Sequence, residues 1–129
     1  MWPAADYFVA LAPLTDQTYQ LFDAAAFRAM PNHAVIINVG RGPLVDTEAL
    51  VDALRSGQIA GAGLDVTDPE PLPDGHPLWE MPNVVITPHL ANPPYSVQRR
   101  IGAHAAKVME RFAAGEAIPT EVDLSLIHI

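Results

Sequence analysis

The sequence predicts an α/β fold with a parallel sheet, flanking helices and a long C-terminal helix. Three short apolar runs bounded by Gly or Pro cover residues 34–39, 59–66 and 84–87, and such runs are typical of buried strands. An amphipathic segment separates the first two runs, which indicates a β-α-β unit and therefore parallel strands. Each run ends in a polar segment. Ligands bind outside the carboxyl ends of parallel strands, so these segments are candidate sites.

Capping and terminating residues place the helices between these strands. Asp23 and Asp46 are suitable N-caps, because a side-chain carboxylate accepts hydrogen bonds from the first free amides of a helix. Gly57 and Gly115 are typical of helix C-termini, and the prolines of the 67–82 loop disfavour a helix or a central strand there. The expected elements are a strand over 7–11, a helix over 24–30, a strand over 34–39, a helix from Asp46 to Ser56, strands over 59–66 and 84–87, and a helix from Pro93 to about Ala114.

The composition disfavours several classes of protein. The chain has 129 residues, 50% of them hydrophobic, and a formal net charge of −8, so we expect one packed domain and no nucleic-acid partner. Cysteine is absent, which excludes disulfides, thiolate metal sites and cysteine nucleophiles. No apolar run approaches the roughly 18 residues of a membrane span. The N-terminus has no basic region of a secretory signal. We therefore expect a cytoplasmic protein without a membrane partner.

Arg41, Glu70 and His89 are the residues that we expect to carry chemistry. Arg41 stands between two glycines directly after an apolar run, and a guanidinium binds a carboxylate through two parallel hydrogen bonds. The imidazole of His89 can give or take a proton near neutral pH. Glu70 lies between two prolines, and a carboxylate beside His89 would favour the imidazolium form. The alternative for each is an ordinary solvated side chain.

The acidic residues near Glu70 leave two alternatives open. Asp65 lies near the end of a buried run, and a buried carboxylate needs a partner, either a backbone group or an amide-bearing ligand. Clustered carboxylates can also hold a hard cation. No Asp-x-Asp-x-Asp-Gly loop is present and prolines interrupt the acids, so we expect no metal site.

Three separate motifs stand in order along the chain: Asn38-Val-Gly-Arg-Gly-Pro-Leu-Val-Asp46, Gly63-Leu-Asp-Val66 with Pro69-Glu-Pro71, and Thr87-Pro-His-Leu-Ala91. Together they resemble the D-isomer-specific 2-hydroxyacid dehydrogenases, which are NAD(P)-dependent oxidoreductases. The resemblance runs from about Ala5 to Asp123 and implies the second half of a Rossmann-type parallel sheet. It implies hydride transfer between NAD or NADP and a small 2-oxo or 2-hydroxy acid, as in glyoxylate/hydroxypyruvate reductases or phosphoglycerate dehydrogenases, and a homodimer for the full-length protein.

The resemblance also implies a role for each matching residue. Arg41 would bind the substrate carboxylate. His89 would be the general acid/base, and Glu70 would orient it and keep it protonated. Asp65 would meet the nicotinamide carboxamide. The residues that would line the cofactor are Ala12, Pro13, Thr18, Val39, Gly40, Arg41, Asp65, His89 and Asn92.

By this resemblance the chain has three parts. Residues 1–93 correspond to the C-terminal half of an NAD(P)-binding domain, and residues 94–116 to a helix that crosses back to an absent substrate domain. Residues 117–129 are a tail, of which 124–129 are interpreted as a cloning or assembly artefact; a short genuine strand is the alternative. The Gly-x-Gly-x-x-Gly turn and the ribose-binding acid of a dinucleotide site are absent. We therefore expect a C-terminal fragment that is inactive alone and tends to self-associate.

A non-catalytic function stays open at this point. Some members of the family act as corepressors and keep the same trio, so a nucleotide-sensing or corepressor-type binding module is the alternative. Long additional segments in the full reading frame would favour it. Formate-type chemistry is disfavoured, because Glu70 is acidic where those enzymes carry an amide. The choice of 2-hydroxy acid and of NAD or NADP is not predicted.

Overall fold

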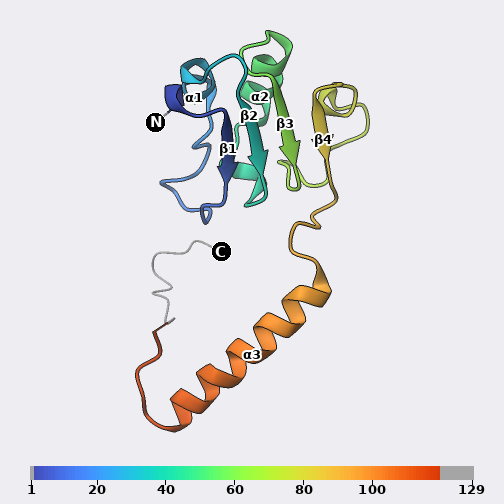
Figure 1. Cartoon of the computed structure of the whole chain (residues 1–129). Helices are drawn as coiled ribbons and strands as arrows, with labels where there is room; N and C mark the ends of the chain where they lie inside the picture. The colour runs from blue at the N-terminus through green and yellow to red at the C-terminus, as the bar shows by residue number, and fades with distance from the viewer. Residues whose placement is uncertain (1, 120–129) are drawn as a thin grey trace.

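Residues 2–119 are described by a computed structural model, apart from the side chains of Ser96 and Arg99. Within this part of the chain, four parallel strands lie side by side in sequence order (Figure 1). The predicted α/β fold with a parallel sheet is therefore confirmed. The strands are β1 (Tyr7–Ala10), β2 (Val35–Asn38), β3 (Gly61–Leu64) and β4 (Val84–Ile86).

Each strand is shorter than predicted, and β3 differs most. The apolar run over residues 59–66 predicted a strand of that length, but pairing is confined to Gly61–Leu64. Ile59 and Val66 are buried outside the paired segment. The amide of Ile59 donates instead to the Ala53 carbonyl, at the end of the preceding helix. An apolar run therefore indicates burial, and burial extends beyond the residues that pair.

Two short helices, α1 (Ala24–Ala29) and α2 (Thr47–Arg55), connect the first three strands. Both begin at the predicted N-caps. Asp23 and Asp46 accept hydrogen bonds from backbone amides three residues later, at 2.7 and 3.0 Å. Each cap satisfies an amide that has no partner within the first turn, which explains why the start of each helix was predictable.

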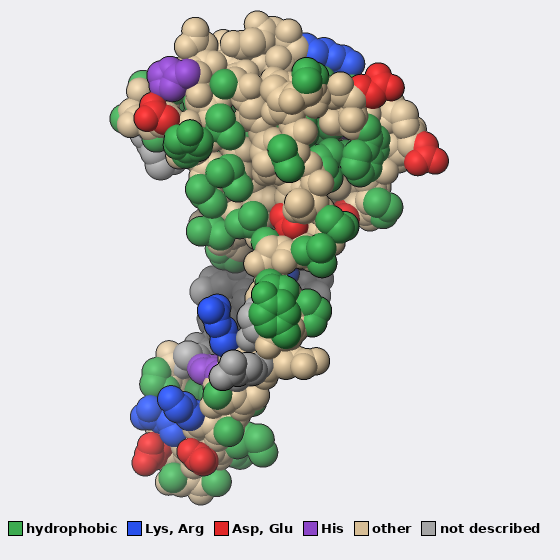
Figure 2. Space-filling model, turned by 45° about the vertical axis from the view of Figure 1, so that its right-hand side comes forward, with side chains coloured by type: hydrophobic (Ala, Val, Ile, Leu, Met, Phe, Trp, Pro, Cys, Tyr) green, Lys and Arg blue, Asp and Glu red, His purple; other side chains and the backbone are tan. Residues whose placement is uncertain are grey.

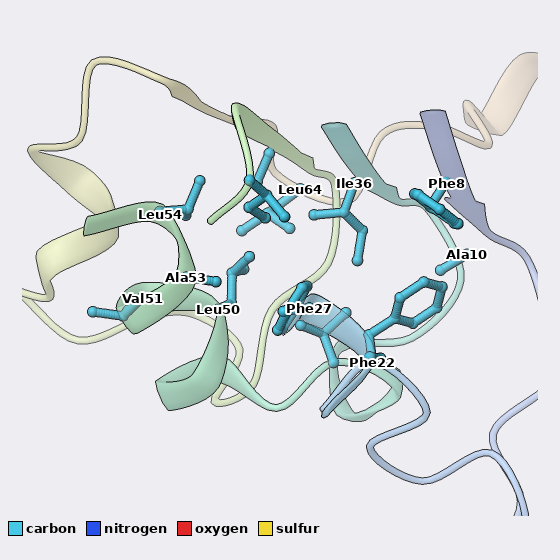
Figure 3. Close-up of a cluster of buried hydrophobic side chains, with 14 of the residues drawn as sticks. Phe8, Ala10, Phe22, Phe27, Ile36, Leu50, Val51, Ala53, Leu54 and Leu64 are labelled. Atoms are coloured by element: carbon cyan, nitrogen blue, oxygen red, sulfur yellow. The ribbon is translucent and has the colours of Figure 1, made fainter. Parts of the chain in front are cut away.

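The hydrophobic core lies between the sheet and these two helices, which cover the same face of the sheet (Figure 3). Phe8, Ile36 and Leu64 point from the strands toward the helices. Phe27 of α1 and Leu50 of α2 meet them and are almost fully buried. This packing holds the strands in register and so determines where their carboxyl ends lie.

The other face of the sheet carries apolar side chains that no described helix covers. Tyr7 and Val9 of β1 and Val85 of β4 are exposed. Hydrophobic side chains accordingly gather over the sheet-bearing part of the molecule in Figure 2. Exposed apolar surface of this kind favours association, and self-association stays a prediction.

The long helix α3 (Pro94–Ala113) extends away from the sheet (Figure 1). Its bounds lie close to those predicted, and Ile101 and Phe112 of its apolar stripe are exposed. No helix of the described residues is both long and apolar enough to cross a membrane. The division of the chain at residues 93 and 94 stays a prediction. Residues 124–129 lie outside the described residues.

Three short 3₁₀ helices were not predicted: η1 (Trp2–Ala4), η2 (Gly42–Leu44) and η3 (Pro77–Trp79). The last lies in the Pro-rich loop that we expected to be extended throughout. Proline fixes φ near the helical value and needs no amide partner, so it suits the first turn of η2 and of η3. His76 caps η3, because its Nδ1 accepts a hydrogen bond from the Leu78 amide at 3.3 Å.

Candidate active site

The candidate site lies at the carboxyl ends of β2, β3 and β4. Asn38 pairs with Leu64 and Leu64 pairs with Ile86, so these three strands end beside one another. The residues that follow them enter three neighbouring loops. These loops carry Arg41 after β2, Glu70 after β3 and His89 after β4, as the apolar runs predicted.

Glu70 and His89 form a direct pair. Their Oε1 and Nδ1 atoms are 2.7 Å apart, and the two side chains are 42% and 49% exposed. An ionised carboxylate can only accept a hydrogen bond, so Nδ1 carries the proton in this pair. The tautomer is thereby determined, and the Nε2 atom is left for a ligand.

The backbone at His89 adopts a left-handed conformation, with φ at 54°. Only a few per cent of non-glycine residues adopt it, and histidine is among those that do so more often than most. The His89 amide is shared between the carbonyls of Asp65 at 2.9 Å and Thr87 at 3.0 Å. Left-handed backbone at a residue of this kind persists only where neighbouring contacts hold it.

Asp65, directly after β3, is buried, and both of its carboxylate oxygens accept hydrogen bonds. Oδ1 accepts hydrogen bonds from the Thr87 hydroxyl and the Leu90 amide, and Oδ2 accepts one from the Ala91 amide at 2.8 Å. The sequence left two kinds of partner open for this carboxylate, a backbone group or an amide-bearing ligand. The structure shows backbone amides as partners. The hydroxyl group of Thr87 is a partner that was not predicted.

These contacts decide the protonation of Asp65. Burial raises the pKa of its carboxyl, whereas the hydrogen bond from Thr87 and those from the Ala91 and Leu90 amides lower it. The positive charge of a protonated His89 lowers it further. The lowering effects prevail, so the pKa lies below its ordinary value of 3.8 and the group is a carboxylate at neutral pH.

Stability should depend on pH through Asp65. Because the folded-state pKa is lowered, the carboxylate stabilises the fold fully above the ordinary value of 3.8, and this contribution is lost as pH falls through the folded-state pKa. Asp65→Asn should therefore lower the free energy of unfolding at pH 7, and the difference from the parent chain should shrink in acid. Urea denaturation at pH 7 and in acid measures the free energy of unfolding of both chains. Asp74→Asn, at an exposed position, is the control. If the difference between Asp65→Asn and the parent chain is the same at both pH values, the expectation is contradicted.

Arg41 lies in a turn that a buried side chain shapes. Asn38 is only 1% exposed, its Nδ2 donates to the Arg41 carbonyl at 2.9 Å, and its Oδ1 accepts from the Gly40 amide at 3.1 Å. The Arg41 guanidinium is exposed and donates to the Gly40 carbonyl at 2.8 Å. Among the described contacts it makes none with Glu70 or His89. Asn38 was overlooked as a site residue; the signal was an amide inside an apolar run, immediately before the Gly-Arg-Gly turn.

The turn that carries Arg41 packs closely against the loop that carries Glu70. A Cβ atom added to Gly42 would lie 1.8 Å from the Thr67 carbonyl oxygen, so only glycine fits there. The Thr47 hydroxyl donates to the Asp68 carbonyl at 2.7 Å, a second link between these segments. The loops of β2 and β3 are therefore held together by backbone contact. The Asp68–Pro69 and Glu70–Pro71 peptide bonds in this loop are cis.

A cavity of about 360 Å³ opens on the uncovered face of the sheet; Glu70 and His89 do not line it, but Leu90 and Ala91, which follow His89 in the chain, do. Its walls are mainly apolar, with Asp65 among the lining residues, and this suits one end of a flat, mainly apolar ring. The predicted cofactor residues Val39 and Asp65 line it. The full lining is Ile37, Val39, Gly63, Leu64, Asp65, Val85, Thr87, Leu90 and Ala91.

The other predicted cofactor residues, Arg41 and His89 included, lie outside this lining. Ala12, Pro13 and Thr18 belong to the loop after β1, where the Thr18 hydroxyl donates to the Pro13 carbonyl at 2.6 Å. Gly40 is packed, since a Cβ there would lie 2.8 Å from a Leu44 methyl group. Asn92 is exposed beyond the His89 loop. Within residues 2–119, no three or more His, Asp or Glu side chains are grouped to hold a metal ion.

Known proteins match both the sequence and the fold of this chain. The family described as "D-isomer specific 2-hydroxyacid dehydrogenase, NAD binding domain" matches residues 1–91. A glyoxylate reductase of Thermofilum pendens is 44% identical over 117 residues, 91% of this chain and 34% of that protein. A glyoxylate reductase/hydroxypyruvate reductase of Mus musculus is 43% identical over 120 residues, 93% of this chain and 37% of that protein.

Solved protein structures are also similar to this chain in fold. A D-isomer specific 2-hydroxyacid dehydrogenase from Xanthobacter autotrophicus Py2, in complex with NADPH and MES, has a TM-score of 0.84 at 44% identity, covering 92% of this chain and 48% of that one. The chain thus spans about a third to a half of the length of these relatives. The resemblance predicted from the three motifs is confirmed: the chain belongs to the D-isomer-specific 2-hydroxyacid dehydrogenase family.

Proposed function

We propose that this chain is the C-terminal part of a reductase that converts a small 2-oxo acid, such as glyoxylate or hydroxypyruvate, into its 2-hydroxy acid with NADH or NADPH. The observation that carries the proposal is the Glu70–His89 pair at 2.7 Å, together with a mainly apolar cavity lined in part by Leu90 and Ala91, which follow His89 in the chain. The names of the glyoxylate reductase relatives support the substrate class. Bound NADPH and NADP in two similar structures support the cofactor.

His89 would supply the proton of this reaction. Its Nδ1 is engaged by Glu70, so Nε2 is the atom available to the substrate oxygen. An imidazolium would donate the Nε2 proton to the carbonyl oxygen and become neutral, leaving a hydroxyl group on the product. The reduced nicotinamide, when bound, supplies the hydride that adds to C2. Glu70 would orient the imidazole by accepting the Nδ1 proton in a hydrogen bond.

Arg41 would bind the substrate carboxylate. Its guanidinium is exposed at the carboxyl end of β2, and its hydrogen bond with the Gly40 carbonyl leaves further N–H donors free for a bidentate contact. Val39 and Asp65 would contact the nicotinamide end of the cofactor from the cavity wall. Ala12, Pro13 and Thr18 would contact it from the loop after β1, with Gly40 and Asn92 at the neighbouring turns.

The test is an assay of the protein encoded together with its upstream sequence. Loss of NADH or NADPH absorbance with glyoxylate and with hydroxypyruvate is the expected result. The 129-residue chain alone is the comparison, and we expect no turnover from it, since it has no Gly-x-Gly-x-x-Gly turn to hold a pyrophosphate. Binding of dinucleotide by the longer protein without turnover of any 2-oxo acid would favour the nucleotide-sensing alternative. A homodimer and a cytoplasmic location stay predictions.

A further inference from the structure

The loop between β4 and α3 is held by one side chain. Three donors from this loop, the Thr87 hydroxyl and two backbone amides, converge on the carboxylate of Asp65. The backbone carbonyl of the same residue accepts the His89 amide at 2.9 Å. An ionised carboxylate has acceptors only, so the three contacts with the side chain agree with its ionised state.

These contacts lie on both sides of His89. Thr87 is held two residues before it, and Leu90 and Ala91 are held directly after it. With its neighbours held in this way, the backbone of His89 is kept at a φ of 54°. In this conformation the imidazole reaches Glu70, which belongs to a different loop.

We propose that Asp65 is a positioning residue for His89. Its hydrogen bonds hold the loop between β4 and α3 in place, so that Nδ1 of His89 contacts Glu70 and Nε2 is available to the substrate. The proposal rests on the proposed function, in which His89 is the proton donor. It is distinct from a contact between Asp65 and the nicotinamide amide, which involves the cofactor and not the loop. A carboxylate oxygen has more than one acceptor site, so both contacts can coexist at Oδ2.

Thr87 separates the two roles. Its hydroxyl donates to Asp65, and valine has nearly the same shape without the donor. Thr87→Val therefore loosens the loop while the Asp65 carboxylate remains to meet a cofactor. Asp65→Asn should loosen the loop more than Thr87→Val does. An amide nitrogen in the place of Oδ2 would face the Ala91 amide, so that two donors would meet.

The first experiment measures kinetics in the longer protein. Displacement of a catalytic group by about 1 Å can lower the rate by about 100-fold, which sets the scale for Asp65→Asn in kcat. For Thr87→Val we expect a loss in kcat of about 3- to 10-fold, the scale of one ordinary hydrogen bond, because the other two hydrogen bonds to the carboxylate remain. Thr87 also lines the cavity, so the Kd for NADH should change less than kcat in Thr87→Val, and Thr87→Ser should restore kcat. Asp74→Asn, an exposed acid in the β3–β4 loop, is the control without effect.

The second experiment needs no turnover. Amide hydrogen exchange of the 129-residue chain, followed by NMR, should be faster at Leu90 and Ala91 in Asp65→Asn, and to a smaller extent in Thr87→Val. The His89 Nδ1 proton, bonded to Glu70 in the parent chain, should be broadened in both variants. Amides of the core strands β1 and β2 should exchange as in the parent chain, which separates loosening of the loop from general unfolding.

The outcomes separate this proposal from the proposed function. If His89→Gln retains full activity, the assignment of His89 as proton donor is wrong, and the positioning role falls with it. If His89→Gln is inactive but Thr87→Val has normal kcat and normal exchange at Leu90 and Ala91, only the positioning role is overturned. A rise in the NADH Kd as the sole effect of Asp65→Asn would assign that residue to the cofactor alone.

Discussion

His89→Gln should lower kcat of the longer enzyme by about 10²–10⁴-fold, the range that a positioned general acid typically contributes. Glutamine keeps a polar side chain of similar length but cannot deliver a proton at neutral pH. The KM for the 2-oxo acid should change little, because the substrate carboxylate is assigned to Arg41. Steady-state kinetics with glyoxylate or hydroxypyruvate measures both constants.

A control for this variant exists within the same sheet. His33 also pairs with a carboxylate, since its Nε2 lies 2.7 Å from Oδ1 of Asp6. Both residues precede their strands, so this pair lies at the amino-terminal edge of the sheet, opposite the candidate site. His33→Gln should leave kcat unchanged. Equal losses in the two variants would show that a histidine–carboxylate pair is needed for folding, and would remove the argument for catalysis at His89.

Gly42→Ala should destabilise the chain by about 3 kcal/mol or more, at or above the upper end for overpacking. The new Cβ would lie 1.8 Å from the Thr67 carbonyl oxygen and 2.9 Å from the Asp68 amide nitrogen. The obstacle is backbone, which cannot turn aside as a flexible side chain can. The two loops must therefore separate, and this moves Arg41 away from Glu70. The free energy of unfolding in urea is the direct measurement.

Gly102→Ala is the control, because a Cβ at Gly102 in α3 would meet nothing within 4 Å. Alanine in a helix interior is more favourable than glycine by about 0.5–1 kcal/mol, so this variant should be neutral or slightly more stable. If Gly42→Ala unfolds at the same urea concentration as the parent chain, the close contact between the two loops is wrong. The argument that contact between the two loops brings Arg41 and Glu70 to the same site then loses its support.

Local signals predicted the elements that depend on local interactions. The N-caps at Asp23 and Asp46 were correct, because a cap bonds to an amide only three residues away. The long helix was close to its predicted bounds, because its apolar spacing and its initial prolines lie within the helix itself. The strand ends were wrong by up to two residues at either end of β3, because apolar character reports burial and not pairing.

The candidate trio was predicted as residues that follow strands, but its contacts were not. Glu70 and His89 meet because two loops, 19 residues apart in the chain, turn toward each other. The partners of Asp65 lie 22 to 26 residues away, so no spacing rule identified them. Asn38 was overlooked because its amide acts on backbone groups of the turn, and such contacts leave only a weak pattern in a sequence.

The amino-acid sequence alone determined the parallel sheet, the helix starts, the family and which residues of the candidate site follow which strand. These follow from hydrophobic periodicity, capping and motif order, which are properties of neighbouring residues. Tertiary structure decided that Glu70 reaches His89 and that Asp65 accepts hydrogen bonds from the loop after β4. It also decided that Gly42 has no room for a side chain. The physical reason is that hydrogen bonds and steric exclusion act over a few ångströms in space, and only packing of the strands brings such distant segments within that range.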